Sequence, residues 1–492
     1  MTSIQSQIKE FYMSEIREEC GVFGIYSDKT GGVAASTYYG LFALQHRGQE
    51  SCGIVVCDDG VFRSHVDSGI VNDVFTTRVL ESLGEGSIAV GHVRYGMAGA
   101  SGKENNQPMV INHVKGRIAI ANNGNLTNYR KLKEELELGG AIFHSVSDCE
   151  VISYILTRER LKCGSIEEAL NHAMNSLEGA YSLVIMSPTK LLAVRDVNGF
   201  KPLCIGKTDD GAFVVASESC ALDAVGAHFI RDVEPGEIIV ADKSGVRSIR
   251  DHCKEKTASP CVFEYIYFAR PDSVIDKMSV HAARIQAGRY LAKEHPVDAD
   301  VVVGVPDSGI DAALGYSYES GITYGLGFIK NKYIGRTFIV PGQSVREDKV
   351  RIKLNPVSET VKGKRVVLVD DSIVRGTTSA RIVKLLRNAG AKEVHLRITA
   401  PPFTHPCYYG TDINSTKDLI ACNHTLEEIT KILDVDSLGY LSIESVKKIA
   451  VPEGGTDMVY CTACFDGEYP TDIPEVAGKH TKYDRKISEG KE

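Results

Sequence analysis

The segment that most constrains the fold is residues 366–379, which read Val-Val-Leu-Val-Asp-Asp-Ser-Ile-Val-Arg-Gly-Thr-Thr-Ser. An apolar run, typical of a buried strand, ends in two adjacent carboxylates, Asp370 and Asp371, and a short loop of Gly and hydroxyl residues follows. An amphipathic helix pattern comes next, over residues 377–386. A continuous Val/Leu strand that leads through a short loop into a helix is typical of a parallel sheet buried on both faces.

A second unit of the same kind lies upstream, in residues 297–316 (VDADVVVGVPDSGIDAALGY). Beyond about residue 280, strand, loop and helix alternate in this way. The second half of the chain is therefore predicted to be a doubly wound parallel α/β domain.

Carboxylates at the carboxyl end of a parallel strand lie where such sheets bind ligands. The backbone N–H groups of the following loop and helix N-terminus can hold a phosphate, and Asp370 and Asp371 can accept hydrogen bonds from ribose hydroxyls and help to bind Mg²⁺. Ser308, after the neighbouring strand, is placed to reach the same metal or phosphate. The alternative for Asp370 and Asp371 taken alone is a solvated turn that caps an ordinary helix.

A basic, Gly/Pro-punctuated stretch over residues 329–353 could fold over an anionic ligand and exclude water. On charge alone, a solvated basic face is an equal alternative. The basic residues of this stretch are Lys330, Lys332, Arg336, Arg346, Lys349, Arg351 and Lys353.

The first half, from Cys20 to about residue 245, is rich in short strand patterns with helical patterns between some of them. Residues 53–65 predict a hairpin that turns at Asp58-Asp59-Gly60, and residues 126–138 and 147–161 predict helices. This mixture predicts an α+β domain of antiparallel sheets with helices packed on their outer faces. A polar stretch at residues 243–260 is expected to be a linker.

The net charge of −8 argues against a broad nucleic-acid-binding surface. No apolar run approaches the roughly 18 residues of a membrane span, and the first nineteen residues lack the apolar core of a secretory signal. We therefore expect a cytoplasmic protein that binds neither membrane nor nucleic acid. Most of its 13 cysteines should then be reduced and buried.

Cys20-Gly21 is uninformative alone, but four further strings follow it in order: Gln45–Glu50 (QHRGQE), Gly91–Tyr95 (GHVRY), Asn123–Leu126 (NGNL) and Ser147-Asp148. Together they resemble the glutaminase domain of the N-terminal-nucleophile amidotransferases. Residues 366–379 resemble the phosphoribosyl pyrophosphate motif of the type I phosphoribosyltransferases. The combination resembles the glutamine phosphoribosylpyrophosphate amidotransferase (amidophosphoribosyltransferase) family from Cys20 to about Pro470, in its iron–sulfur subgroup.

This resemblance implies a fold and a division into domains. The first domain would be an αββα sandwich of the N-terminal-nucleophile hydrolase type. The expected divisions are a propeptide (1–19), a type 2 glutamine amidotransferase domain (20–255), a phosphoribosyltransferase domain that carries the cluster ligands (256–470) and a polar tail (471–492).

At the glutamine site the resemblance implies Cys20 as nucleophile, with its own α-amine as base after propeptide removal. Arg94 would pair with the α-carboxylate of glutamine and Asp148 with its α-ammonium. Arg47 would also belong to the glutamine-binding residues and would support the nucleophile's surroundings. Asn123 and Gly124 would form the oxyanion hole. The family usually has His where Asn122 stands here, so we expect a tuned site that keeps its activity.

At the second site the resemblance implies a phosphoribosyl pyrophosphate pocket with Mg²⁺ held by Ser308, Asp370 and Asp371. The residues implied to bind phosphoribosyl pyrophosphate are Asp370, Asp371, Ser372, Arg375, Gly376, Thr377, Thr378, Ser379, Lys330, Arg336 and Lys353.

Cys461-Thr462-Ala463-Cys464 could bind zinc, form a redox pair or ligate an iron–sulfur cluster. The resemblance adds Cys261 and Cys407 as the other two ligands of a [4Fe–4S] cluster, which would join three segments of the chain. Zinc remains an alternative.

The reaction implied is glutamine, phosphoribosyl pyrophosphate and water giving phosphoribosylamine, glutamate and pyrophosphate, the first step of purine synthesis. The family also implies a homodimer or homotetramer and inhibition by purine nucleotides. One rival is another amidotransferase, such as a glucosamine-6-phosphate synthase, but residues 366–379 indicate a different acceptor. Another is a non-catalytic sensor of phosphoribosyl pyrophosphate, which would leave the ordered residues around Cys20 unexplained.

Overall fold

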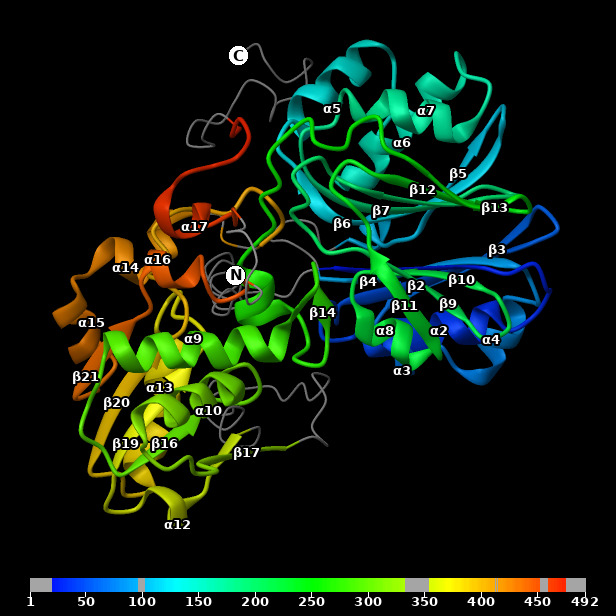
Figure 1. Ribbon diagram of the computed structural model, residues 1–492. Helices are drawn as coiled ribbons and strands as arrows, with labels where there is room; N and C mark the ends of the chain where they lie inside the picture. The colour runs from blue at the N-terminus through cyan, green and yellow to red at the C-terminus, as the bar shows by residue number, and fades with distance from the viewer. Residues whose placement is uncertain are drawn as a thin grey trace, which may run out of the picture.

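The computed structural model describes residues 20–95, 102–331, 354–411, 413, 415–451 and 459–474. Figure 1 shows two bodies, a sandwich drawn in blue to green and an α/β body drawn in green to orange. The expected propeptide and most of the predicted tail lie outside the described residues. In the part of the chain that the structure describes, no helix has the length and apolarity needed to cross a membrane.

The first body contains two antiparallel sheets that lie face to face. The first sheet has the order β11-β9-β10-β1-β4-β2-β3 and the second the order β13-β12-β8-β7-β6-β5. The first sheet comprises β1 (Gly21–Tyr26), β2 (Ser51–Asp58), β3 (Val61–Ser68), β4 (Ile88–Arg94), β9 (Cys204–Thr208), β10 (Phe213–Ala216) and β11 (Ala227–Asp232). The second comprises β5 (Met109–His113), β6 (Gly116–Leu126), β7 (Gly179–Met186), β8 (Leu191–Arg195), β12 (Ile238–Asp242) and β13 (Gly245–Ile249).

Helices cover the outer face of each sheet, as Figure 1 shows. The first sheet is covered by α2 (Val33–Ala43), α3 (Val71–Val74), α4 (Thr77–Ser82) and α8 (Ser219–Ala224). The second is covered by α5 (Tyr129–Leu138), α6 (Asp148–Arg160) and α7 (Ile166–Met174). The predicted αββα sandwich is confirmed, as are the helices predicted at residues 126–138 and 147–161.

Strand β1 is apolar throughout because both of its faces are buried. Val22 belongs to the core between the two sheets, whereas Phe23 belongs to the core under the helices of the first sheet. Because side chains alternate across a strand, a strand buried on both faces has no polar positions. Gly24 gives further proof of the close packing, since a Cβ there would lie 2.7 Å from Val184 Cγ1 in the opposite sheet.

Two loop predictions have different outcomes. The hairpin is confirmed: β2 pairs with β3, and the turn has Asp59 at φ 45° and Gly60 at φ 80°, as a two-residue turn of the primed type requires. The linker prediction is wrong for Gly245–Ile249, which forms edge strand β13 against β12. A tight turn between β12 and β13 lets the polar residues of this segment pair as an edge strand, with all of its side chains except Ile249 exposed.

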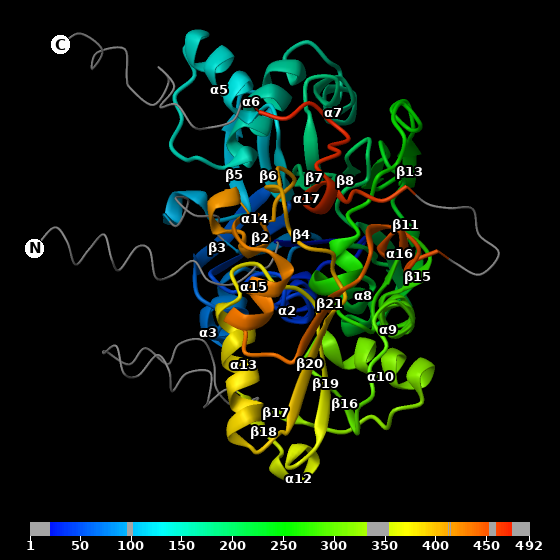
Figure 2. The ribbon, with the colours of Figure 1, turned by 90° about the vertical axis from the view of Figure 1, so that its left-hand side faces the viewer.

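The second body contains a parallel sheet of order β16-β19-β20-β21, with α9 and α10 against one face and α13 on the other (Figure 2). This confirms the predicted doubly wound α/β domain. Its main elements are α9 (Val280–Glu294), β16 (Val301–Gly304), α10 (Gly309–Ser320), β19 (Arg365–Asp370), α13 (Thr377–Asn388), β20 (Glu393–Ile398) and β21 (Ser437–Tyr440).

Shorter elements complete the chain. The paired short strands are β14 (Val274–Ile275) with β15 (Met278–Ser279) and β17 (Phe328–Lys330) with β18 (Leu354–Pro356). The short helices are α12 (Ser358–Val361), α14 (Ile420–Asn423), α15 (Leu426–Ile432), α16 (Ile443–Val446) and α17 (Ala463–Asp466), with a π-helical turn at Glu264–Phe268 and 3-10 turns at Lys103–Asn105 and Thr416–Asp418.

Candidate active sites

Cys20 lies directly before β1 and is half-buried. Strand β1 pairs with β4 so that Gly21 stands opposite Val93, which brings Cys20 to the end of β4. There the Cys20 thiol donates to the Tyr95 carbonyl oxygen at 3.8 Å. The register of two buried strands therefore positions the predicted nucleophile beside Arg94, the last residue of β4.

Arg94 and Asp148 are side chains of opposite charge that come from a strand and a helix: Arg94 is buried at the end of β4, and Asp148 is half-buried at the start of α6. Arg94 Nη1 donates to Asn106 Oδ1 at 3.4 Å. Asp148 is the first residue of α6, and its Oδ2 accepts the Leu126 N–H at 2.6 Å. Burial raises the pKa of Asp148 to about 7 despite this bond.

Asn123 and Gly124 lie near the end of β6. The Asn123 side chain is buried, and its Nδ2 has no hydrogen-bond partner among the described residues. Gly124 has φ 150°, and a Cβ there would come 2.1 Å from the Ala180 carbonyl oxygen, so only glycine fits. A buried amide donor with no partner among the described residues, next to a glycine at positive φ, is the arrangement expected of an oxyanion hole.

The strand that carries Asn123 is held from both sides at Asn122. His92 Nε2 lies 3.0 Å from the Asn122 carbonyl oxygen, and the Asn122 N–H donates to Gln107 Oε1 at 2.8 Å. Burial lowers the pKa of His92 to about 3, so the imidazole is neutral and Nε2 carries the proton that the carbonyl accepts. Both of these hydrogen bonds are made by the backbone of Asn122. That the site stays active with Asn in place of the family's His remains a prediction.

Cys149 provides evidence that the candidate residues surround one point. Its thiol is buried and donates to Gln107 Oε1 at 3.0 Å. Burial raises its pKa first, and Asp148 and Cys20 raise it further while Arg94 lowers it. Cys20, Arg94 and Asp148 thus lie within electrostatic range of the same buried thiol.

Arg47 lies in a buried ion-pair network near the predicted glutamine site. Its side chain is fully buried, and its guanidinium makes ion pairs with Glu218 and Glu264. Although burial alone would raise the pKa of Glu218, Arg47 and His46 hold it well below its usual value. Arg47 also lies under the nucleophile's neighbour, because a Cβ on Gly21 would contact Arg47 Cδ at 3.4 Å. A role of Arg47 in supporting the nucleophile's surroundings stays a prediction.

The second candidate site lies at the carboxyl ends of β16 and β19. Ser308, the N-cap of α10, and Ser372 both donate to the Asp371 carboxylate. Burial raises the pKa of Asp370 well above its usual value, and the neighbouring Asp371 raises it further. The buried Asp370 carboxylate, the half-buried Asp371 carboxylate and the serine hydroxyls bonded to Asp371 form an oxygen-only donor set of the kind that suits Mg²⁺.

The loop after Asp371 ends at Gly376, whose φ of 78° is the left-handed conformation that precedes α13. Helix α13 then begins with Thr377, Thr378 and the buried Ser379, so its N-terminal N–H groups face the site. Arg375 pairs with Asp418 at 3.1 Å, and Lys330 pairs with Asp307. Arg336 and Lys353 lie outside the described residues.

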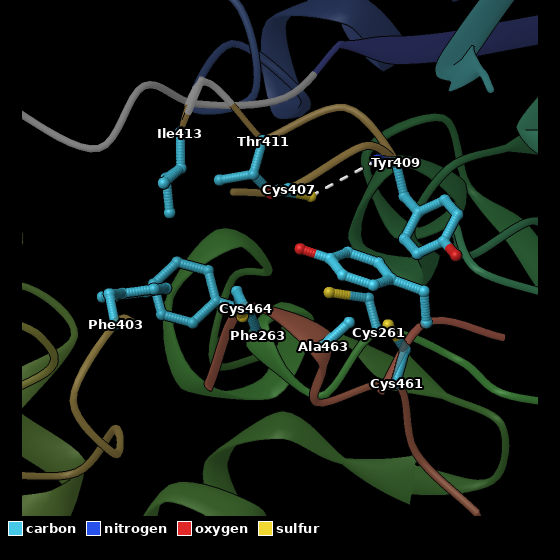
Figure 3. Close-up of a pocket in the computed structure, with 11 residues that line it drawn as sticks. Cys261, Phe263, Phe403, Cys407, Tyr409, Thr411, Ile413, Cys461, Ala463 and Cys464 are labelled. Atoms are coloured by element: carbon cyan, nitrogen blue, oxygen red, sulfur yellow. Dashed lines mark hydrogen bonds between the residues drawn. The ribbon is translucent and has the colours of Figure 1, made fainter. Parts of the chain in front are cut away.

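The four predicted cluster cysteines line one pocket at the junction of the two bodies, and Figure 3 shows their side chains around it. Cys261 and Cys461 are joined by a parallel β-bridge, and Cys407 Sγ accepts the Tyr409 N–H at 3.4 Å. Burial raises the pKa of Cys464 well above its usual value, and the other three thiols raise it further. The structure thus gathers four cysteines from three distant segments.

Apolar and aromatic side chains complete this pocket, among them Phe263, Phe403, Ile413 and Tyr469. Phe200 of the first body stacks on Tyr409 with ring centroids 4.0 Å apart. The pocket therefore lies in a hydrophobic junction that both bodies share.

Sequence reasoning missed Glu218, Glu264, His92 and Gln107 as parts of the glutamine site. Glu264 was visible in principle, since a glutamate inside the apolar run at residues 261–269 predicts a buried ion pair. The others lie far apart in the sequence, on a strand, in a loop and at a helix N-cap, and carry no local signal.

Two family profiles match this chain. The profile described as a glutamine amidotransferase domain matches residues 92–224, and that described as a phosphoribosyl transferase domain matches residues 276–437. Together with the sandwich, the doubly wound sheet and their two sites, these matches define a glutamine amidotransferase joined to a phosphoribosyltransferase in one chain.

Full-length relatives narrow the class. The chain is 52% identical over 468 residues to the amidophosphoribosyltransferase of Methanocaldococcus jannaschii, which covers 92% of this chain and 98% of the relative. It is 47% identical over 460 residues to that of Bacillus subtilis, with 93% and 95% covered. A solved structure of the glutamine phosphoribosylpyrophosphate amidotransferase from B. subtilis, complexed with ADP and GMP, superposes with a TM-score of 0.85 at 47% identity and covers 92% of this chain and 98% of that one.

The chain belongs to the amidophosphoribosyltransferase family. It hydrolyses glutamine and transfers the ammonia to phosphoribosyl pyrophosphate, which gives phosphoribosylamine, glutamate and pyrophosphate in the first step of purine synthesis. Mg²⁺ accompanies the phosphoribosyl pyrophosphate in this family.

Proposed function

We propose that glutamine hydrolysis begins at Cys20 after residues 1–19 have been removed. The freed α-amine of Cys20 takes the thiol proton, because a reference pKa near 8 leaves part of it neutral at cellular pH. The thiolate attacks the carboxamide carbon, the C–N bond breaks, and the ammonia leaves with the proton that the amine returns. Water then hydrolyses the thioester and releases glutamate.

Arg94 and Asp148 bind the amino-acid end of glutamine. A guanidinium suits the bidentate geometry of the α-carboxylate, and the Asp148 carboxylate suits the α-ammonium. Their environment supports this assignment, since buried Arg94 and half-buried Asp148 are both shielded from solvent, which strengthens their attraction to a substrate charge of opposite sign. Arg47 does not touch the substrate in this proposal. It packs beneath Gly21 and so helps to hold the neighbouring Cys20 in place.

Asn123 and Gly124 stabilise the negative oxygen of the tetrahedral intermediate. The observation that carries the proposal is the buried Asn123 Nδ2, which has no hydrogen-bond partner in the described part of the chain. A buried donor without a partner costs about 1–3 kcal/mol, a cost that a catalytic oxyanion would offset.

The N-terminus of the mature protein tests this assignment. Mass spectrometry of active enzyme should find a chain that begins at Cys20 and is alkylated at Cys20 by a glutamine-like electrophile, with exposed Cys422 as the control thiol. Active enzyme that begins at Met1 would overturn it.

The second half-reaction takes place at the ends of β16 and β19. Asp370 and Asp371 accept hydrogen bonds from the ribose hydroxyls. The phosphates are bound by backbone N–H groups and side chains of residues 372–379 and by Lys330. Arg336 and Lys353 are proposed to close over the pyrophosphate. Ser308, Asp370 and Asp371 would hold Mg²⁺, which supplies positive charge to the pyrophosphate leaving group.

Asp370 and Asp371 fit a bound cation for an electrostatic reason. Burial and mutual repulsion disfavour two carboxylates in this turn, and a divalent cation reverses both effects. Ammonia attacks the ribose carbon there, the bond to pyrophosphate breaks, and the ammonia loses a proton. Ammonia is proposed to pass between the sites inside the protein.

Cys261, Cys407, Cys461 and Cys464 are proposed to hold a [4Fe–4S] cluster with a structural role. All four are described residues, yet no three of their sulfurs lie within 4.8 Å of one another. A tetrahedral zinc ion with Zn–S bonds near 2.3 Å needs sulfurs about 3.8 Å apart, so the wider spacing and the apolar lining favour the larger cluster. Iron and sulfide analysis of protein purified without oxygen tests this; about one zinc and no iron would contradict it.

The remaining proposals follow from the family. The domains are taken as residues 20–255 and 256–470, with a polar tail at 471–492. Purine nucleotides inhibit the enzyme, which fits the solved relative complexed with ADP and GMP. The enzyme works in the cytoplasm as a homodimer or homotetramer.

A further inference from the structure

A group of three potential metal ligands lies outside both active sites, at the turn between α6 and α7. Cys163 is in the turn, and Glu168 and His172 lie on α7. Residues four apart on a helix share a face, so Glu168 and His172 stand one above the other beside the turn. Cys163 is buried, whereas Glu168 and His172 are exposed, so an ion in solvent can reach the group.

The three potential ligand atoms are separated by distances close to those between ligands of one metal ion. One atom from each residue falls within 4.8 Å of the others, and Cys163 Sγ lies 3.3 Å from His172 Nδ1. A tetrahedral zinc ion with Zn–S near 2.3 Å and Zn–N near 2.0 Å needs a sulfur–nitrogen separation of about 3.6 Å. A small movement of these two side chains would admit the ion.

Neighbouring contacts fix the turn. Glu168 Oε2 accepts the Gly164 N–H at 2.9 Å, and the Ser165 hydroxyl caps α7 by accepting the Glu168 N–H. Arg160 Nη1 donates to the Cys163 carbonyl oxygen at 2.6 Å. These bonds hold the backbone around the three ligand residues. Metal binding would therefore cost little conformational entropy.

The surrounding charges leave the group receptive to a cation. Glu159 lies in electrostatic range of both Cys163 and His172, and its carboxylate pairs with Lys162 at 2.8 Å. Arg160 and Lys162 are the opposing cations near Cys163. A thiolate and the Glu168 carboxylate together would neutralise a divalent ion.

We propose that Cys163, Glu168 and His172 form a Zn²⁺ site. One sulfur, one imidazole nitrogen and one carboxylate oxygen select zinc over Mg²⁺ or Ca²⁺, which prefer oxygen alone. Three protein ligands leave a fourth position for water. Because α6 begins at Asp148 and ends at this turn, the ion fastens the far end of the helix that carries Asp148 and takes no part in glutamine hydrolysis.

Co²⁺ binding to the full chain, with its native cysteine centre in place, tests the proposal. Wild type should bind one more Co²⁺ per chain than Cys163→Ser or His172→Gln. The thiolate ligand of this extra ion should give a sulfur-to-cobalt charge-transfer band. Cys422→Ser should match wild type. Comparison of variants removes any contribution from the other cysteines.

Two further measurements separate a metal site from a hydrogen-bonded thiol–imidazole pair. Zn²⁺ should slow alkylation of Cys163 at least tenfold, and it should raise the melting temperature of wild type but not of His172→Gln. His172 is exposed, so its replacement should leave the protein folded. Equal Co²⁺ stoichiometry in wild type and His172→Gln, or alkylation of Cys163 that ignores Zn²⁺, would overturn the proposal.

Discussion

Asn125 Nδ2 donates to the carbonyl oxygen of Tyr408 at 2.9 Å, across the junction of the two bodies. Asn125 follows the predicted oxyanion residues Asn123 and Gly124, and Tyr408 follows the predicted cluster ligand Cys407. Gly410 also lies close to this strand, since a Cβ there would come 3.7 Å from the Gly124 carbonyl carbon. The glutamine site therefore rests directly on the loop that carries Cys407.

Asn125→Ala should lower glutamine-dependent turnover several-fold and leave ammonium-dependent synthesis unchanged. Loss of one hydrogen bond costs about 1 kcal/mol, or roughly fivefold, and it is lost where Gly124 is positioned. Steady-state kinetics with each nitrogen source measure this. Asn112→Ala, at an exposed position of β5, is the matched control, and an equal loss in both variants would show that the bond has no special role.

The Michaelis constant for glutamine should fall as pH rises through about 7. Because burial raises the pKa of Asp148 to about 7, the side chain is neutral below this value and cannot pair with the α-ammonium. Above it the carboxylate forms and binding strengthens. Asp148→Asn should give a high Michaelis constant with no pH dependence in this window. A flat wild-type profile from about pH 6 to 8 would contradict the assignment.

Gly124→Ala should reduce glutamine-dependent turnover by about 10²–10³-fold, the usual cost of losing an oxyanion donor. The added Cβ would meet the Ala180 carbonyl oxygen at 2.1 Å and displace the Gly124 N–H. Gly116→Ala is the control, because Gly116 also has positive φ in β6 but an added Cβ there meets nothing within 4 Å. Similar kinetics for the two variants would mean that backbone strain alone explains the loss.

Asp370→Asn should abolish ammonium-dependent synthesis while the free energy of unfolding at pH 7 stays equal to or above that of wild type. The raised pKa of Asp370 means that its ionisation opposes folding as pH rises, and Asn removes this effect while it can still accept the Asp371 N–H. Denaturant unfolding measures the stability, with exposed Asp223→Asn as control. A clear loss of stability would contradict the view that this pair is kept for ligand binding.

Local patterns predicted the fold well. The apolar strands, the hairpin at Asp59-Gly60 and the strand–loop–helix after Asp370 each depend on contiguous residues, and the structure has all of them. Strand β13 was missed because its polar sequence reads as a linker until β12 is present to pair with it.

The two sites also differ in how far contiguous residues could predict them. The turn at Asp370 could be found from one segment, whereas Cys20, Arg94 and Asp148 needed the family resemblance to be read together. The support from His92 could not be predicted from either source, because it depends on how two strands far apart in the sequence meet. Glu264 carries a local signal, but that signal does not identify Arg47 as its partner.

Turnover of Cys20→Ala with glutamine and with ammonium tests the central claim, that one chain divides the reaction between two sites. Glutamine-dependent synthesis should fall at least about a thousandfold, since the nucleophile is gone, while ammonium-dependent synthesis at Asp370 and Asp371 stays within about twofold of wild type. Cys422→Ala should retain both activities. Loss of both activities in folded Cys20→Ala protein, or retention of glutamine-dependent synthesis, would contradict the account.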